Sequence, residues 1–158
     1  MRPTEPATEP PLADLLAGAA AAISDPEAAG RAMRAALAER PEDPEARLAA
    51  YRFHFYRHDY GAALEQAHWL IAHAARRLNI ATDWLAVSPD DAPFTEHAFA
   101  PGLYLQALIA AGYCAARLGE EALARDTLGK AAALDPSDRF GGAHLLRVVL
   151  ARADEDDD

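Results

Sequence analysis

The side chains best suited to chemistry in this 158-residue chain are its six histidines and its one cysteine. His54 and His58 are four residues apart, the spacing that lets two imidazoles on one helical face meet one metal ion. His68 or Asp59 would be the third ligand if the chain brought either near. No cysteine pair, His-Glu-x-x-His motif or second such histidine pair accompanies them. We therefore predict no metal centre, and His54 and His58 are the candidates to test.

Nucleophilic catalysis has less support in the sequence. Cys114 lies in an apolar helical stretch without an evident activating partner, which is typical of a buried structural thiol. Ser24 has the position of a helix cap, while Ser88 and Ser137 lie beside prolines in expected turns. Gly141-Gly142 lacks the surrounding residues of a phosphate-binding loop. The sequence therefore predicts a protein that is not an enzyme and binds no cofactor.

The composition indicates which elements position these side chains. The chain contains 40 alanines, and alanine has the highest helix propensity, whereas strands are depleted in it. A length near 150 residues is typical of one domain, so we expect one all-α domain over residues 11–152. Proline and glutamate are frequent in residues 1–10, and residues 154–158 are all acidic. We expect a disordered tail at 1–10 and an acidic tail at 153–158.

The net charge and the apolar segments indicate which partners and which cellular location to expect for this chain. The formal net charge of −10 argues against binding to nucleic acid or to an anionic membrane, since both need a positive field. Residues 12–23 are apolar, but Asp14 interrupts them and acidic residues precede them, unlike a signal peptide. We expect no membrane-spanning helix, because no run of 18 uncharged apolar residues stands out. The expected location is cytoplasmic.

Alanines recur in this sequence at a fixed interval. Ala29 and Ala63 are 34 residues apart, and Ala124 follows Ala63 after one more such interval and a further 27 residues. Within residues 60–78 apolar side chains recur in steps of three and four, as on one face of a helix. Asp-Pro pairs at residues 25–26 and 43–44 are signals for helix starts. These patterns predict helices at about 11–22, 26–39, 44–57, 60–78, 103–117, 120–133 and 138–152.

The last repeat unit has a recognisable pattern of large, small and turn-forming residues. These are Leu108, Gly112, Gly119, Ala124, Leu128, Ala131 and Pro136. Asp59-Tyr60 followed by Ala63-Leu64 is similar to the turn into the second helix of the same kind of unit. Over residues 10 to 150 the chain thus resembles the tetratricopeptide repeat (TPR) family. The resemblance implies three antiparallel helical hairpins and a C-terminal capping helix in a short α-solenoid, with an insertion at residues 79–102 between repeats two and three.

The family's pattern also implies where a partner binds. In such repeats the first helix of each hairpin lines a concave groove. Tyrosine and arginine often carry binding energy at interfaces, and arginine suits a carboxylate. The alternative is that the aromatic side chains are core and the arginines only solvated. The implied groove residues of repeats two and three are Arg52, Phe55, Tyr56, Gln106, Ile109, Tyr113 and Arg117.

The resemblance implies a non-enzymatic adaptor or chaperone-like module, whose partner is a protein or peptide with a carboxylate or an acidic segment. The aromatic run at residues 51–56 and Asp83-Trp84 also resemble small bacterial repeat proteins found beside nitrogen-fixation genes, which implies an accessory role there. Two alternatives stay open. One is a histidine-based metal or cofactor carrier, and the other is a self-associating structural protein, so we expect a monomer or a weak homodimer.

The insertion is the second candidate region. It is longer than most connections in compact domains, and such loops are often functional. Trp84, Phe94 and Phe99 make it too apolar for a free linker. Two interpretations stay open: the insertion fills the space between repeats two and three, or it forms a lid across the groove.

Overall fold

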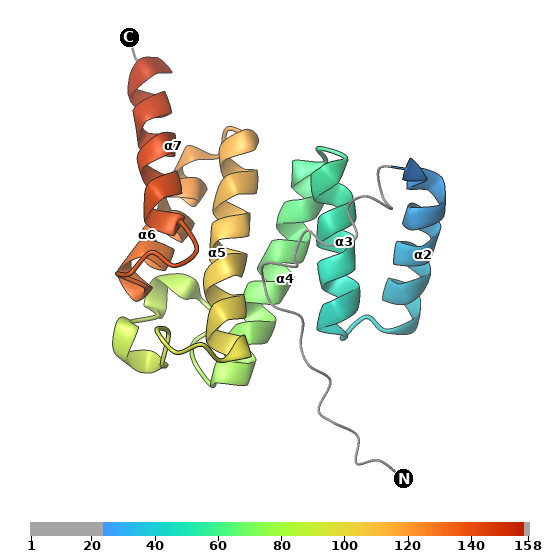
Figure 1. Ribbon diagram of the computed structural model, residues 1–158, viewed down its shortest axis with the longest axis horizontal. Helices are drawn as coiled ribbons and strands as arrows, with labels where there is room; N and C mark the ends of the chain where they lie inside the picture. Colours follow the sequence, from blue (N-terminus) through green and yellow to red (C-terminus); the bar gives the residue numbers. More distant parts are fainter. Residues whose placement is uncertain (1–23, 157–158) are drawn as a thin grey trace.

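The computed structural model describes residues 24–156, and these form an all-α structure, which confirms the predicted class (Figure 1). No β-strand is present among these residues. The expected tail at 1–10 and the expected helix at 11–22 lie outside the described residues. The elements are α2 (Pro26–Glu39), α3 (Pro44–Tyr56), α4 (Tyr60–Leu78), η2 (Trp84–Ala86), η3 (Pro89–Asp91), α5 (Phe99–Arg117), α6 (Glu121–Leu134) and α7 (Gly142–Asp156).

Aspartates start three of these helices, because a carboxylate at the N-cap satisfies one of the backbone N–H groups that lack a partner inside the helix. Asp25, Asp43 and Asp59 cap α2, α3 and α4, and each accepts from a backbone N–H at 2.9 to 3.2 Å. Proline follows the cap in α2 and α3. Proline lacks the N–H that would be unsatisfied there. The starts predicted at residues 26, 44 and 60 are therefore confirmed.

Two helices differ from the prediction at their starts. Helix α5 begins at Phe99 rather than at 103, because Pro101 is in its first turn, where a missing N–H costs nothing. The insertion is shortened accordingly. Helix α7 begins at Gly142 rather than at 138, because Asp138 (φ 54°) and Gly141 (φ 81°) have left-handed backbones. It continues to Asp156, beyond residue 152, and Ala153 is buried.

The helices stack in sequence order, from α2 at one end to α6 and α7 at the other (Figure 1). Each packs mainly on its neighbours in the sequence, and α4 and α5 form the centre of the core. Many buried positions are alanines, which allow the backbones to approach closely. By length and composition α5 alone among the described helices resembles a membrane span, but 61% of that window is buried inside the protein. Its residues form part of the core described above.

Candidate functional site

Aromatic rings from three helices in the middle of the stack meet where α3 ends, α4 begins and α5 ends. The Tyr113 ring centroid lies 5.5 Å from that of Phe55 and 6.0 Å from that of Tyr60. Phe55 also contacts Tyr56, at 5.6 Å. The guanidinium of Arg117 lies over the Tyr60 ring, 5.0 Å from its centroid. We call these five residues the aromatic–arginine cluster, and its four rings are half-buried.

The chain folds this way because of the turn between α3 and α4. His58 has a left-handed backbone (φ 59°), which ends α3 and lets α4 begin at Tyr60, next to the last turn of α3. Helix α5 packs on α4 and runs back to the same end. Its last residues therefore come close to the first residues of α4. Tyr60 was predicted from the sequence to lie at the turn into the second helix of a repeat but was not predicted to line the groove; its place directly after the turn was the signal that it belongs to the cluster.

Ionisation is disfavoured both in the cluster and at the buried side chains beside it. Within the cluster, desolvation raises the pKa of Tyr60 and Tyr113 adds to the shift, while Arg117 opposes it. Beside the cluster, burial raises the pKa of Tyr51 and raises the pKa of Cys114 to about 11. The Arg117 guanidinium makes no hydrogen bond or ion pair within residues 24–156. Its N–H groups are therefore available to a partner's carboxylate.

A cleft of about 450 Å³ lies beside the cluster, between the end of α5 and α7. Val148 is 42% exposed there, although it is apolar. Two arginines and two glutamates also line the cleft, so its lining carries no net charge. The lining residues are Tyr113, Ala116, Arg117, Gly119, Glu121, Leu145, Val148, Val149, Arg152, Ala153 and Glu155.

The sequence analysis missed the α7 side of this cleft because it assigned that helix only the role of a cap. A terminal cap is expected to have a polar outer face. Leu145, Val148 and Val149 instead lie at steps of three and four, so they line one face of the helix. This apolar face was a detectable signal for a further surface.

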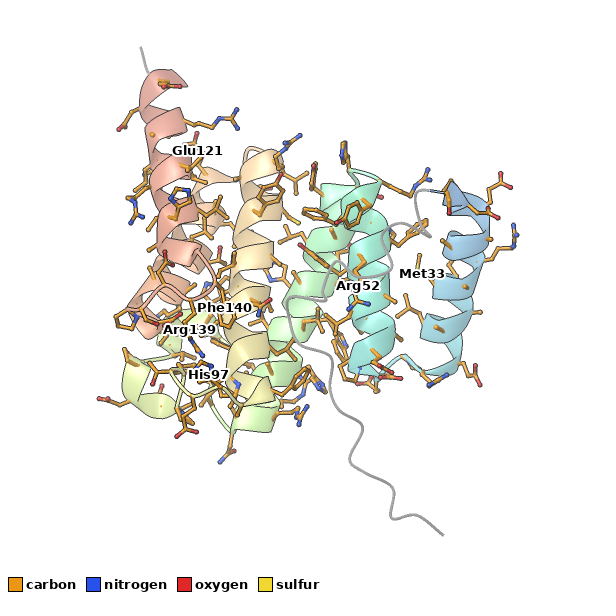
Figure 2. All side chains as sticks on the ribbon, viewed as in Figure 1. Met33, Arg52, His97, Glu121, Arg139 and Phe140 are labelled. Carbon is orange, nitrogen blue, oxygen red and sulfur yellow. The ribbon has the colours of Figure 1, made fainter. Side chains whose placement is uncertain are left out.

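The structure brings only part of the predicted groove together. Phe55, Tyr56, Tyr113 and Arg117 meet in the cluster, as described above. Arg52 instead lines a separate cleft of about 270 Å³ between α2 and α3. Figure 2 shows Arg52 on α3, well away from Glu121 at the α5–α7 cleft.

The other two predicted groove residues lie further down α5. The Ile109 side chain is covered by the start of α7, because a Cβ added at Gly142 would lie only 3.2 Å from it. Gln106 is half-buried one turn earlier on α5, outside both clefts. Neither residue contributes to the cluster.

The two candidate metal ligands do not share a helical face. Helix α3 ends at Tyr56, so His58 lies in the turn and stacks on Tyr60 with 5.8 Å between centroids. His54 faces Asp59 instead, with 3.9 Å between Nδ1 and the carboxylate. Burial lowers the pKa of His54, an effect that Asp59 and Glu65 oppose. Within residues 24–156 no group of three or more His, Cys, Asp or Glu side chains is placed to hold a metal ion.

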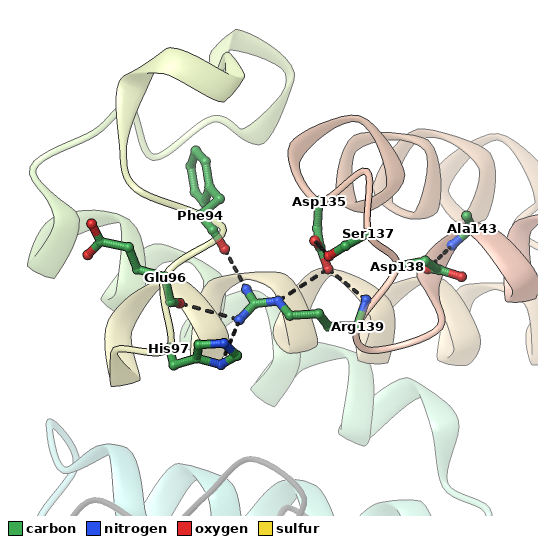
Figure 3. A network of polar contacts seen from close by, with 8 residues as sticks. All are labelled: Phe94, Glu96, His97, Asp135, Ser137, Asp138, Arg139 and Ala143. Carbon is green, nitrogen blue, oxygen red and sulfur yellow. Dashed lines mark hydrogen bonds and ion pairs between the residues drawn. The ribbon is translucent and has the colours of Figure 1, made fainter.

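The insertion is tied to α6 and to the loop after it. Lys130 Nζ donates to the carbonyl oxygen of Val87 at 2.6 Å, and Arg139 Nη2 donates to that of Phe94 at 2.6 Å. Figure 3 shows Arg139 held in turn by Asp135, with 3.7 Å between Nε and the carboxylate. The Asp135 carboxylate also accepts from the Arg139 backbone N–H, at 2.9 Å. These contacts fix the insertion against the body of the protein.

The three aromatic residues of the insertion pack inward or along neighbouring helices. Phe94 is 2% exposed and contacts Tyr104, while Trp84 stacks on His68. Phe99 is the first residue of α5 and lies under the Arg77 guanidinium. Tyr113 is fourteen residues further along α5, about 20 Å at 1.5 Å per residue. In this structure the insertion therefore lies at the opposite end of α5 from the cluster.

The fold and the site together define an all-α protein of stacked helices that carries an aromatic–arginine cluster beside an open cleft. The chain is similar to an uncharacterized 19.8 kDa protein in the nifW 5′ region of Azotobacter chroococcum mcd 1. The two are 32% identical over 120 residues, which cover 73% of this chain and 66% of the relative. The chain thus spans just under two thirds of that relative's length. No family model matches the chain, and no solved structure matches it.

Proposed function

We propose that this protein is a non-enzymatic adaptor of the tetratricopeptide type that binds a peptide segment of another protein in the α5–α7 cleft. The observation that carries the proposal is the cleft itself, because it combines exposed apolar side chains with aromatic rings and arginines. Tyrosine and arginine are among the residues that supply most of the affinity at binding surfaces, and exposed apolar side chains beside them are typical of such surfaces.

The arrangement of helices supports the tetratricopeptide interpretation. Helices α3, α5 and α7 would be the first helices of successive units, and most residues of the cluster and the cleft come from them; Tyr60 of α4 and Glu121 of α6 also contribute. The groove used by the partner then lies one repeat further along the stack than the groove predicted from the sequence. It is formed by repeat three and the capping helix, with Phe55 of repeat two at its edge.

The chemistry of the cleft specifies an amphipathic partner. An apolar side chain inserted beside Val148 removes exposed apolar surface from water, and a carboxylate of the same segment pairs with Arg117. Tyr60 already holds the guanidinium of Arg117 from below, so less side-chain entropy is lost when the partner binds. Glu121 and Glu155 exclude segments that carry only acidic residues, because like charges facing each other across a contact are unfavourable.

The genomic position of the similar Azotobacter protein supports an accessory role near nitrogen fixation. The same role is implied by the resemblance of residues 51–56 and Asp83-Trp84 to proteins found beside such genes. The partner is then a protein made under the same conditions.

The test uses peptides selected by display on the wild-type protein, and compares their affinity for two pairs of variants. Val148→Asp and Arg117→Glu alter the cleft and are expected to weaken binding at least tenfold. Leu150→Asp and Arg125→Glu introduce the same changes at exposed positions outside the cleft, and binding should change less than twofold. Peptides that bind all four variants equally would show that the cleft is not the site. A wild-type protein that selects no peptide would refute the adaptor itself.

A further inference from the structure

A pocket of about 490 Å³ lies at the opposite end of the stack, between α2 and the last turn of α3. Three of its six lining residues are arginines, Arg31, Arg34 and Arg57, against one glutamate, Glu27. The positive end of the α2 dipole and the negative end of the α3 dipole both lie at this pocket and oppose each other, so its charge comes from the arginines. We call this the basic pocket. Its lining has an excess of positive side chains on a protein whose formal net charge is −10.

The basic pocket has a defined wall. The Arg57 guanidinium lies 5.5 Å from the centroid of the Phe53 ring. A Cβ added at Gly30 would lie 3.1 Å from Phe53 and 3.1 Å from Nη1 of Arg34, so the glycine lets α2 approach this ring closely. Within residues 24–156 the three guanidinium groups make no hydrogen bond or ion pair. Five donors on each guanidinium suit the bidentate binding of carboxylates.

The other end of the molecule, at the C-terminus of α7, carries a run of negatively charged side chains. Asp154 and Glu155 are exposed in the last turn of α7, and the sequence continues with three aspartates to residue 158. Acidic side chains at a helix C-terminus are unfavourable, because that end of the helix dipole is negative. Asp154 and Glu155 make no hydrogen bond or ion pair with the described residues. The acidic run at 154–158 therefore does not stabilise the helix on which it begins.

We propose that the acidic run of one copy docks in the basic pocket of a second copy. The acidic run of one copy cannot reach the basic pocket of the same copy, because α2 and α7 lie at opposite ends of the stack (Figure 1). Helices α3, α4 and α5 lie between them, and helices pack about 8–10 Å apart. Five extended residues span at most about 18 Å, which is less than this separation. The contact is thus intermolecular and joins two different surfaces.

Joining different surfaces has a definite consequence for assembly. Each copy uses one acidic run and one basic pocket, so a pair still has one of each unused and can add further copies. The association is weakened by salt, since charges beyond about 8–10 Å are screened at physiological ionic strength and exposed ion pairs contribute little each. This self-association is separate from peptide binding in the proposed function, because the acidic run and the cleft share only Glu155.

Sedimentation of the full chain over a range of concentrations at low salt tests the proposal. The wild type is expected to form species larger than one 16.9 kDa chain, in amounts that rise with concentration and fall with salt. The pocket variant Arg31→Glu/Arg34→Glu should remain one chain. So should a run variant in which Asn replaces the four aspartates at 154 and 156–158 while Glu155 of the cleft is kept. Arg76→Glu/Arg125→Glu, which makes the same charge change at exposed sites elsewhere, should associate like the wild type.

Mixing the two defective proteins gives the decisive measurement. The pocket variant retains its acidic run and the run variant retains its pocket, so an equimolar mixture should form pairs and stop at two chains. A mixture that stays monomeric would overturn the proposal, as would a wild type that stays monomeric or defective variants that associate like it. Association abolished by Val148→Asp but not by the pocket variant would also overturn it, because the copies would then be joined through the cleft.

Discussion

Gly112 lies where α5 packs closely on α6, and replacing it with alanine tests this packing directly. A Cβ at this position would lie 2.4 Å from Cγ of Leu128, 2.7 Å from its Cδ2 and 2.9 Å from Oγ1 of Thr127. All three contacts are shorter than carbon and oxygen atoms tolerate. Neither neighbour can move easily, because both are 0% exposed and the Thr127 hydroxyl donates to the Leu123 carbonyl at 2.8 Å.

The expected loss of stability follows from two opposing effects. Overpacking a core costs about 1–3 kcal/mol, and three contacts below 3.0 Å place this site at the upper end. Alanine is favoured over glycine inside a helix by about 0.8–1 kcal/mol. The net effect for Gly112→Ala is a loss of about 1–2 kcal/mol. For a chain of this length that lowers the midpoint of thermal unfolding by about 2–8 °C.

Gly129→Ala is the matched control. Gly129 also lies inside a helix, α6, but a Cβ there meets no heavy atom within 4 Å. Only the propensity effect remains, so stability should rise by about 0.5–1 kcal/mol. Circular dichroism at 222 nm during urea unfolding measures both variants. A Gly112→Ala protein as stable as wild type would refute the close approach of α5 and α6.

A double variant separates overpacking from other effects of Gly112→Ala. Leu128→Ala removes Cγ and Cδ2, two of the three atoms that the new Cβ would strike, and the two nearest. In the Gly112→Ala protein this second change should cost less than it does in wild type, with a coupling energy of about 0.5–3 kcal/mol. Additive losses would show that the two side chains do not meet.

Three further predictions concern buried polar groups. Burial lowers the pKa of His54 and His68. The unfolded chain then binds more protons than the folded one, so the free energy of unfolding should fall as pH drops below about 6.5. His68→Gln should make the difference in unfolding free energy between pH 7.5 and pH 5.5 smaller, as measured by urea unfolding. Because burial raises the pKa of Cys114 to about 11, a thiol reagent at pH 8 should label it quickly only in urea; fast labelling of the native protein would contradict its burial. The Tyr104 hydroxyl is buried without a hydrogen-bond partner among the described residues, so Tyr104→Phe should be neutral or should stabilise by up to about 1–3 kcal/mol; a loss above about 1 kcal/mol would reveal a partner.

Local patterns in the sequence were enough to predict most helices. Asp25, Asp43 and Asp59 stand where α2, α3 and α4 begin, because capping depends only on a side chain and the backbone of the next turn. The period of the apolar residues defines which face of α4 is buried for the same local reason. Where a helix start depended on left-handed backbones, as at Asp138, the pattern failed by four residues.

The sequence by itself therefore determined an all-α protein, three of its helix starts and an aromatic run at the end of α3. Only the tertiary structure decided which of these residues meet. In the structure Tyr113 lies beside Phe55, whereas Arg52 lines another cleft. His54 is on α3 but His58 lies in the turn after it, and apolar side chains of α7 line the α5–α7 cleft. The physical reason is that helix formation is governed by residues within one or two turns, whereas contacts between helices depend on the turns and close packing that set their spacing and direction.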